Sequence, residues 1–209
     1  MIKKLVKMIF SLVIICAICI VLLIFYIGGG IGYLQNAVVS KFYSSSPTIS
    51  SISKNLGDFS ALPKDYKLIK SLNALGVSAL TAEVIQNKQK IIILNAGPFL
   101  NITKQDIKSN NIAAQLKNLT SIGPLQFINF DKLEIIKNSS FNISKQEIPY
   151  VKVDFGYLNN AKNNSEGIIG VIDLAGKNNL FISVSDSGKF KLEKVINFLK
   201  ISNKPSNNL

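Results

Sequence analysis

Residues 167–186 read GIIGVIDLAGKNNLFISVSD and contain two apolar runs separated by a short polar stretch. Both runs are rich in β-branched and aromatic residues, which favour strands, and glycine and asparagine stand between them. Two such runs close together in the chain are typical of a β-hairpin. We expect residues 167–176 to pair with residues 179–186, with the turn at Lys177–Asn179.

A third strand is predicted just before this hairpin, in the stretch IPYVKVDFGYL at residues 148–158. Apolar and polar residues alternate there, which is the period of a strand with one buried face. Residues 91–94 form a continuous apolar run, which is typical of a central strand covered on both faces. The same reasoning predicts strands at residues 66–76, 77–87, 90–97 and 132–143.

Two helices are predicted between and after these strands. Thr103 and Asp106 have the spacing of a capping box, in which each residue binds a free backbone amide of the other. The apolar residues that follow share one helical face, and so do those near the carboxyl end of the chain. These faces consist of Ile112, Leu116 and Leu119 in the first case, and Leu192, Val195, Ile196 and Leu199 in the second.

The order of strands, helix, strands and helix predicts an α+β domain over residues 63–202, with a mostly antiparallel sheet flanked by helices. The domain resembles the PsbP-like family on four features: the opening LPKDYKLI, the strand IIILNAG before a helix, the hairpin and the closing helix KLEKVINFLK. The resemblance covers roughly residues 62–202. It implies a role in assembly or binding rather than catalysis, and it carries no functional residue over to this chain.

The amino end of the chain contains a long apolar segment. Met8 to Ile27 carries no charge, and twenty helical residues span roughly 30 Å, the thickness of a bilayer's hydrocarbon core. Lys3, Lys4 and Lys7 precede it, and the next charge is Lys41. By the positive-inside rule, the amino terminus stays in the cytoplasm and the domain lies outside.

These features predict five regions. They are a basic cytoplasmic tail (1–7), a single transmembrane signal-anchor helix (8–34), a serine-rich tether (35–62), the extracytoplasmic α+β domain (63–202) and a loose tail (203–209). The main alternative is a signal peptide cleaved after Gly30. Gly28 and Gly32 have the spacing of a helix-pairing motif, and they also suit a flexible exit from the membrane. Cys16 and Cys19 each follow isoleucine, whereas lipidation requires a small residue there.

The charge of the chain does not indicate a nucleic-acid partner. The net charge is +12, but three of the lysines lie in the amino-terminal tail, and the chain contains no arginine. Nucleic-acid interfaces cluster their basic residues and rely on arginine for forked contacts. We therefore expect no nucleic-acid partner; the expected partners are membrane lipid, through the anchor, and a protein of the cell envelope.

Several catalytic chemistries are excluded by the residue types that are absent. The chain has no histidine, and its two cysteines both lie in the apolar segment. This removes histidine-dependent triads and the imidazole and thiolate ligands of most transition-metal sites, so no metal and no cofactor are predicted. Two routes remain. A serine–lysine pair is conceivable at Ser185, Ser187 and Lys189, and a carboxylate pair at Asp154 and Asp173.

A surface turn and surface carboxylates are the preferred interpretations of these residues, so no catalytic residue is assigned. The function predicted from the sequence is a membrane-anchored extracytoplasmic domain of the inner (plasma) membrane with a non-catalytic role in binding or assembly. An anchored hydrolase and an accessory subunit of an inner-membrane complex are the alternatives. Five Asn-x-Ser/Thr sequences occur, at Asn101, Asn118, Asn138, Asn142 and Asn163, and matter only in a secretory lumen.

Overall fold

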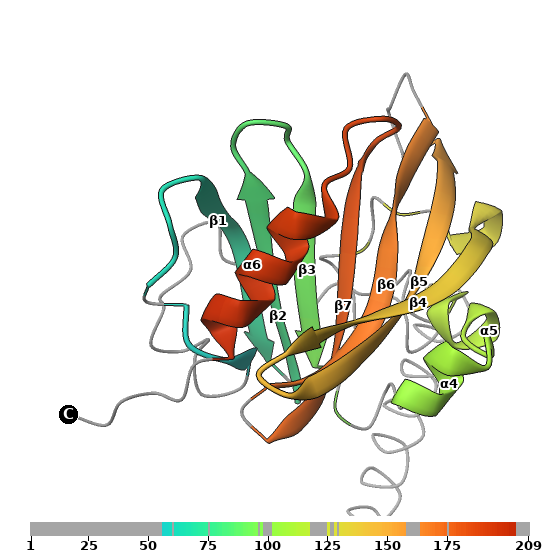
Figure 1. Cartoon of the computed structure of the whole chain (residues 1–209), viewed down its shortest axis with the longest axis horizontal. Coiled ribbons are helices and arrows are strands. Elements are labelled where there is room, and N and C mark those ends of the chain that lie inside the picture. Colours follow the sequence, from blue (N-terminus) through green and yellow to red (C-terminus); the bar gives the residue numbers. More distant parts are fainter. Residues whose placement is uncertain are drawn as a thin grey trace, which may run out of the picture.

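The computed structural model shows one antiparallel sheet of seven strands with helices on both faces (Figure 1). It describes residues 56–59, 61–74, 76–95, 97, 102–117, 125, 128, 130–157, 164–174 and 176–203. The expected α+β class with an antiparallel sheet is confirmed for these residues. Everything predicted before residue 56 lies outside them, including the anchor, Lys3, Lys4, Lys7, Gly28 and Gly32.

The sheet is built from two meanders that meet in its middle. Its strand order is β1-β2-β3-β7-β6-β5-β4, and each neighbouring pair is antiparallel. The strands are β1 (Tyr66–Ala74), β2 (Val77–Val84), β3 (Lys90–Asn95), β4 (Glu134–Ile143), β5 (Gln146–Tyr157), β6 (Asn164–Leu174) and β7 (Lys177–Asp186). The helices are α4 (Lys104–Lys108), α5 (Ala113–Lys117), the 3-10 helix η3 (Phe130–Lys132) and α6 (Leu192–Ser202).

Both faces of the sheet are covered by apolar side chains from the helices. On one face α6 buries Val195, Phe198 and Leu199, and on the other Ile107 of α4 and Leu116 of α5 are buried. The strands between these layers therefore need apolar residues on both sides. The run of residues 91–94 meets this requirement, since each of its side chains is at most 1% exposed.

The alternation predicted for residues 148–158 is confirmed where the structure describes the side chains. Val151, Val153 and Phe155 are buried on the α4 face, while Lys152 and Asp154 are half-buried on the other. The closing helix differs slightly from its prediction. Its most buried stripe includes Phe198, whereas Leu192 and Ile196 are only half-buried at its margin.

The turn of the central hairpin lies earlier in the chain than the sequence predicted. Residues 177–179 belong to β7, where they pair with Leu174, Asp173 and Ile172 of β6. The turn falls instead between Leu174 and Lys177. Gly176 there adopts a φ of 71°, a conformation that glycine reaches without steric cost. The side-chain Nδ2 of the buried Asn179 donates to the carbonyl oxygens of Leu174 and Lys177, which holds this residue inside the strand.

The packed domain also begins earlier than the boundary predicted at residue 63. Leu56 and Phe59 are 0% and 1% exposed, and the ring of Phe59 lies 5.5 Å from that of Phe198. The amide of Asp58 donates to the carbonyl oxygen of Ser202. Apolar side chains within the serine-rich stretch therefore complete the core beneath α6. The last residues of this stretch belong to the domain and not to a tether.

Tyr66 ties β1 to α6 through a hydrogen bond, and the burial of this side chain makes stability depend on pH. Its hydroxyl donates to the carbonyl oxygen of Lys194 at 2.8 Å. Burial, with smaller contributions from the charges of Asp65 and Glu193, raises the pKa of Tyr66 from 10.0 to about 12. The fold thus favours the protonated form, and this stabilisation is complete below pH 10 and lost as the pH rises from 10 to 12.

We expect Tyr66→Phe to lower the free energy of unfolding by about 1 kcal/mol at pH 7, because one buried hydrogen bond is lost. The difference between wild type and variant should shrink above pH 10, since only the wild type loses stability by ionisation of residue 66. Urea denaturation at pH 7, 10 and 11 measures this. A difference that stays constant across the range contradicts the assignment.

The hairpin between β4 and β5 has a turn whose residues are poorly suited to it. Ser144 and Lys145 connect the paired residues Ile143 and Gln146, and their φ angles are 47° and 67°. Two positive φ angles are typical of a type I′ turn, which favours Asn-Gly. Replacing both residues by Asn-Gly should therefore stabilise the domain by about 1 kcal/mol. The urea midpoint measures this, and Lys145→Gln, which removes only the charge, should leave it unchanged.

Candidate functional site

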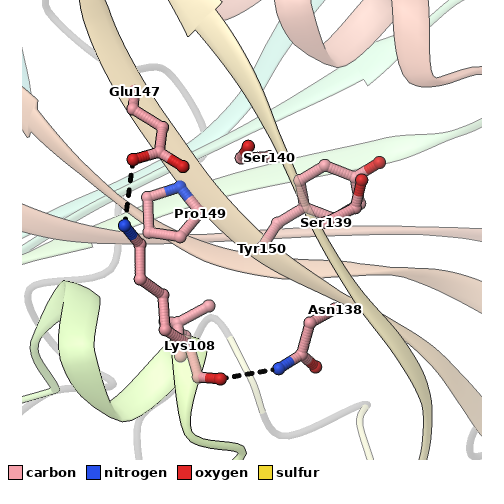
Figure 2. A pocket seen from close by; sticks show the side chains of 8 residues that line it. Lys108, Asn138, Ser139, Ser140, Glu147, Pro149 and Tyr150 are labelled. Atoms are coloured by element: carbon pink, nitrogen blue, oxygen red, sulfur yellow. Dashed lines mark hydrogen bonds and ion pairs between the residues drawn. The ribbon is translucent and has the colours of Figure 1, made fainter.

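A groove lies on the α4 side of the sheet, between α4 and two strands at one edge of the sheet, β5 and the edge strand β4 (Figure 2). It is open to solvent and has a volume of about 440 Å³, within the usual range of ligand sites. Its lining is mainly polar, with hydroxyl, amide and charged groups above an apolar floor. The lining residues are Ile107, Lys108, Asn138, Ser139, Ser140, Glu147, Pro149 and Tyr150.

The position of α4 is fixed by the predicted capping box, which the structure confirms. The amide of Asp106 donates to Oγ1 of Thr103 at 3.2 Å, and the amide of Thr103 donates to Oδ2 of Asp106 at 2.8 Å. Hydrogen bonds from Thr103 lower the pKa of Asp106. The side chain of Ile107 is fully buried against the sheet. The helix therefore starts at a defined residue and is anchored beside the groove.

Lys108 connects the helix to both strands of the groove. Its ammonium lies 2.9 Å from Oε2 of Glu147 on β5, and its carbonyl oxygen accepts a hydrogen bond from Nδ2 of Asn138 on β4. Figure 2 shows both contacts. Hydrogen bonds, first from Lys108 and then from Ser140, lower the pKa of Glu147. The groove thus carries one charge of each sign, and these two charges neutralise each other.

A second polar contact holds α4 against the middle of the sheet. Asp173 of β6 accepts from Nζ of Lys104 at 2.6 Å and from Nε2 of Gln146 at 2.8 Å. All of these charged groups are partly exposed, so each pair contributes little to stability. These contacts link α4 to β5 and β6 beside the groove.

The two carboxylates predicted as a possible pair are far apart. Asp154 of β5 lies opposite Glu166 of β6 in the strand register. Asp173 lies seven residues beyond Glu166 on β6. That is about 23 Å along a strand, and an odd spacing places the side chains on opposite faces. Glycosidase carboxylates lie about 5–9.5 Å apart, so Asp154 and Asp173 do not form a catalytic pair.

The serine–lysine candidates do not assemble into a nucleophile with its base either. Ser185 is 5% exposed inside β7, whereas Ser187 is exposed after the strand. The ammonium of Lys189 lies 3.0 Å from Oδ2 of Asp186, and its side chain is 58% exposed. A lysine acting as base must be desolvated. Ser187 and Lys189 belong instead to an exposed turn that follows β7.

The other predicted sites can be placed in part. Within the part of the chain that the structure describes, no three acidic, histidine or cysteine side chains gather around a point that could hold a metal ion. Of the five sequon asparagines, Asn138 and Asn142 lie exposed on β4, and the other three lie outside the described residues. Among the described helices, none is both long and apolar enough to cross a bilayer.

Comparisons with known families leave the groove to be interpreted from its own chemistry. The chain matches no protein-family model, and a search of curated proteins gave no match.

Proposed function

We propose that the chain is a single-pass, membrane-anchored domain that works outside the cytoplasm by binding or assembling with a partner, not by catalysis. The observation that carries this proposal is the segment Met8–Ile27, which is uncharged and directly follows three lysines. Its length fits a bilayer better than the shorter core of a cleaved signal peptide. The resemblance to PsbP-like domains supports the same kind of role.

The arrangement of polar groups in the described domain supports a binding role. The residue types available for catalysis lie apart in the sheet, as Asp154 and Asp173 illustrate. The groove instead combines hydroxyl and amide groups with an internally neutralised ion pair, Lys108–Glu147. Such a lining can form many weak hydrogen bonds, and it lacks an activated nucleophile or an acid–base pair.

Cysteine labelling of the full chain tests location and orientation together. Ile2→Cys and Ser187→Cys place one thiol at each end, keep all three orienting lysines, and leave Cys16 and Cys19 in the apolar segment. In intact cells a membrane-impermeant maleimide should label Ser187→Cys and not Ile2→Cys, and permeabilisation should expose the second. Both variants should stay in the membrane fraction after carbonate extraction.

Two results would overturn the proposal. Recovery of the wild-type chain in the soluble cytoplasmic fraction would show that the apolar segment does not anchor it in a membrane. A mature chain whose mass corresponds to a start after Gly30, and which therefore lacks residue 2, would show that the segment is a cleaved signal peptide.

A further inference from the structure

The two edges of the sheet differ in how they are protected against pairing with another strand. Edge strand β1 has a bulge between Leu68 and Lys70, and Lys64, Lys67 and Lys70 at or before this edge are all exposed. Bulges and lysines are the usual means by which proteins prevent a free edge from accepting a further strand. The edge at β1 is therefore closed to partners.

On edge strand β4 these features lie only at its two ends, in the bulge beside Lys137 and in the exposed turn residue Lys145. Its bulge lies between Ile135 and Lys137, and from Lys137 to Ile143 the pairing with β5 is regular. Residues 138–143, NSSFNI, contain no charge and no proline. Four of them are exposed, and no strand in the described part of the chain pairs with their outer side. Among the described residues, this stretch therefore has no strand on its outer side, and its last residue, Ile143, packs in the core beside α6.

The groove runs beside this unprotected stretch. Asn138, Ser139 and Ser140 belong both to the free edge and to the groove lining, and the Lys108–Glu147 ion pair leaves the groove without net charge. An extended peptide on β4 would place every second side chain on the α4 face. These side chains would meet hydroxyl and amide groups and no unpaired charge, so the chemistry of the groove matches an uncharged peptide.

We propose that residues 138–143 bind an extended, uncharged segment of a partner protein, which adds an eighth strand to the sheet and places alternate side chains in the groove. Main-chain hydrogen bonds would supply affinity, and the groove would select the side chains. The inference deepens the proposed binding role and rests on it for the existence of a partner.

A second copy of the chain fits this edge less well than a peptide does. Six paired residues are about 20 Å long, and sheet edges about 10 Å thick would bury only about 400 Å² in total. Specific stable interfaces bury about 1,200 Å² or more. A single peptide strand can lie along the edge and enter the groove at once, which two rigid domains meeting edge to edge cannot do.

Site-specific photocrosslinking in the source cells tests the proposal on the full chain. A benzophenone amino acid is placed singly at positions 139, 140 and 142 on β4, and at positions 67 and 73 on β1 as controls. We expect crosslinks to another protein from β4 only. As the position on β4 advances by one residue, the crosslinked position in the partner should move by one, as paired strands require. Ser139→Lys should reduce crosslinking from position 142 about five-fold, whereas Ser187→Lys should not.

Three outcomes would overturn the inference. They are crosslinks to a second copy, crosslinks from β4 no stronger than those from β1, and crosslinked positions without a constant register. Loss of the anchor would be seen separately, in the maleimide labelling. It would change the compartment in which crosslinks form but not their register, so the two proposals can fail independently.

Discussion

Replacing Gly167 with alanine should destabilise the domain by about 3 kcal/mol or more, because the added methyl group has no space between the central strands. A Cβ at this position would lie 1.9 Å from the carbonyl oxygen of Ser183 and 3.0 Å from the ring of Phe155. The closer atom belongs to the backbone of β7, which is hydrogen-bonded between β3 and β6. It cannot move without separating strands at the centre of the sheet.

Urea denaturation followed by circular dichroism measures this effect, with Gly176→Ala as the matched control. Gly176 lies in the turn of the same hairpin and has open space around its missing Cβ. Its φ of 71° alone should make alanine cost about 1 kcal/mol there. Equal losses for the two variants would show that the close approach at Gly167 is relieved without strain.

Replacing Gln89 with leucine should cost about 2–4 kcal/mol, because it leaves buried polar groups without partners. This side chain is fully buried. Its Nε2 donates to Oγ of Ser183 and to the carbonyl oxygen of Lys191, and its Oε1 accepts from the amide of Lys191 and from Nδ2 of Asn87. Lys191 is the N-cap residue of α6, but its side chain forms no hydrogen bond to the free amides of the helix. Gln89 therefore caps this helix from the turn between β2 and β3.

The same substitution at an exposed glutamine, Gln105→Leu on α4, is the control and should change stability by less than about 0.5 kcal/mol. Hydrogen exchange provides a second measurement. The amide of residue 191 should lose its protection in Gln89→Leu, since its acceptor is removed. Unchanged exchange at this amide would contradict the capping role even if the variant were less stable.

The parts of the fold with a clear local signal were predictable from the sequence. Alternation identified β5 through Val151 and Val153, and the spacing of Thr103 and Asp106 identified the start of α4. These features depend on residues that are neighbours in the chain. The short turns of the hairpins were harder, because Gly176 and the asparagines after it are all common turn residues. Only the burial of Asn179 decides between the two possible positions.

The groove and the cap of α6 had no such signal. Lys108, Asn138 and Glu147 come from three separate elements, and each is an ordinary polar residue in the sequence. Gln89 stands in the polar stretch NKQ between β2 and β3, and nothing nearby in the sequence marks it as buried. Burial of a polar residue depends on which distant segments pack over it, here β7 and α6, and a single sequence does not encode that locally.

The pairing of β3 with β7 has a consequence for the order in which the chain can fold. Lys90 pairs with Val184 and Leu94 with Leu180, so the apolar strand β3 has no neighbour on one side until nearly the whole domain has been synthesised. Contacts this distant in sequence slow folding, and an unpaired apolar strand is prone to aggregate while it waits. During synthesis β1, β2 and β3 form an incomplete unit. The domain should therefore reach its stable state only after β7 and α6 have emerged, which makes the nascent chain dependent on protection until synthesis is nearly finished.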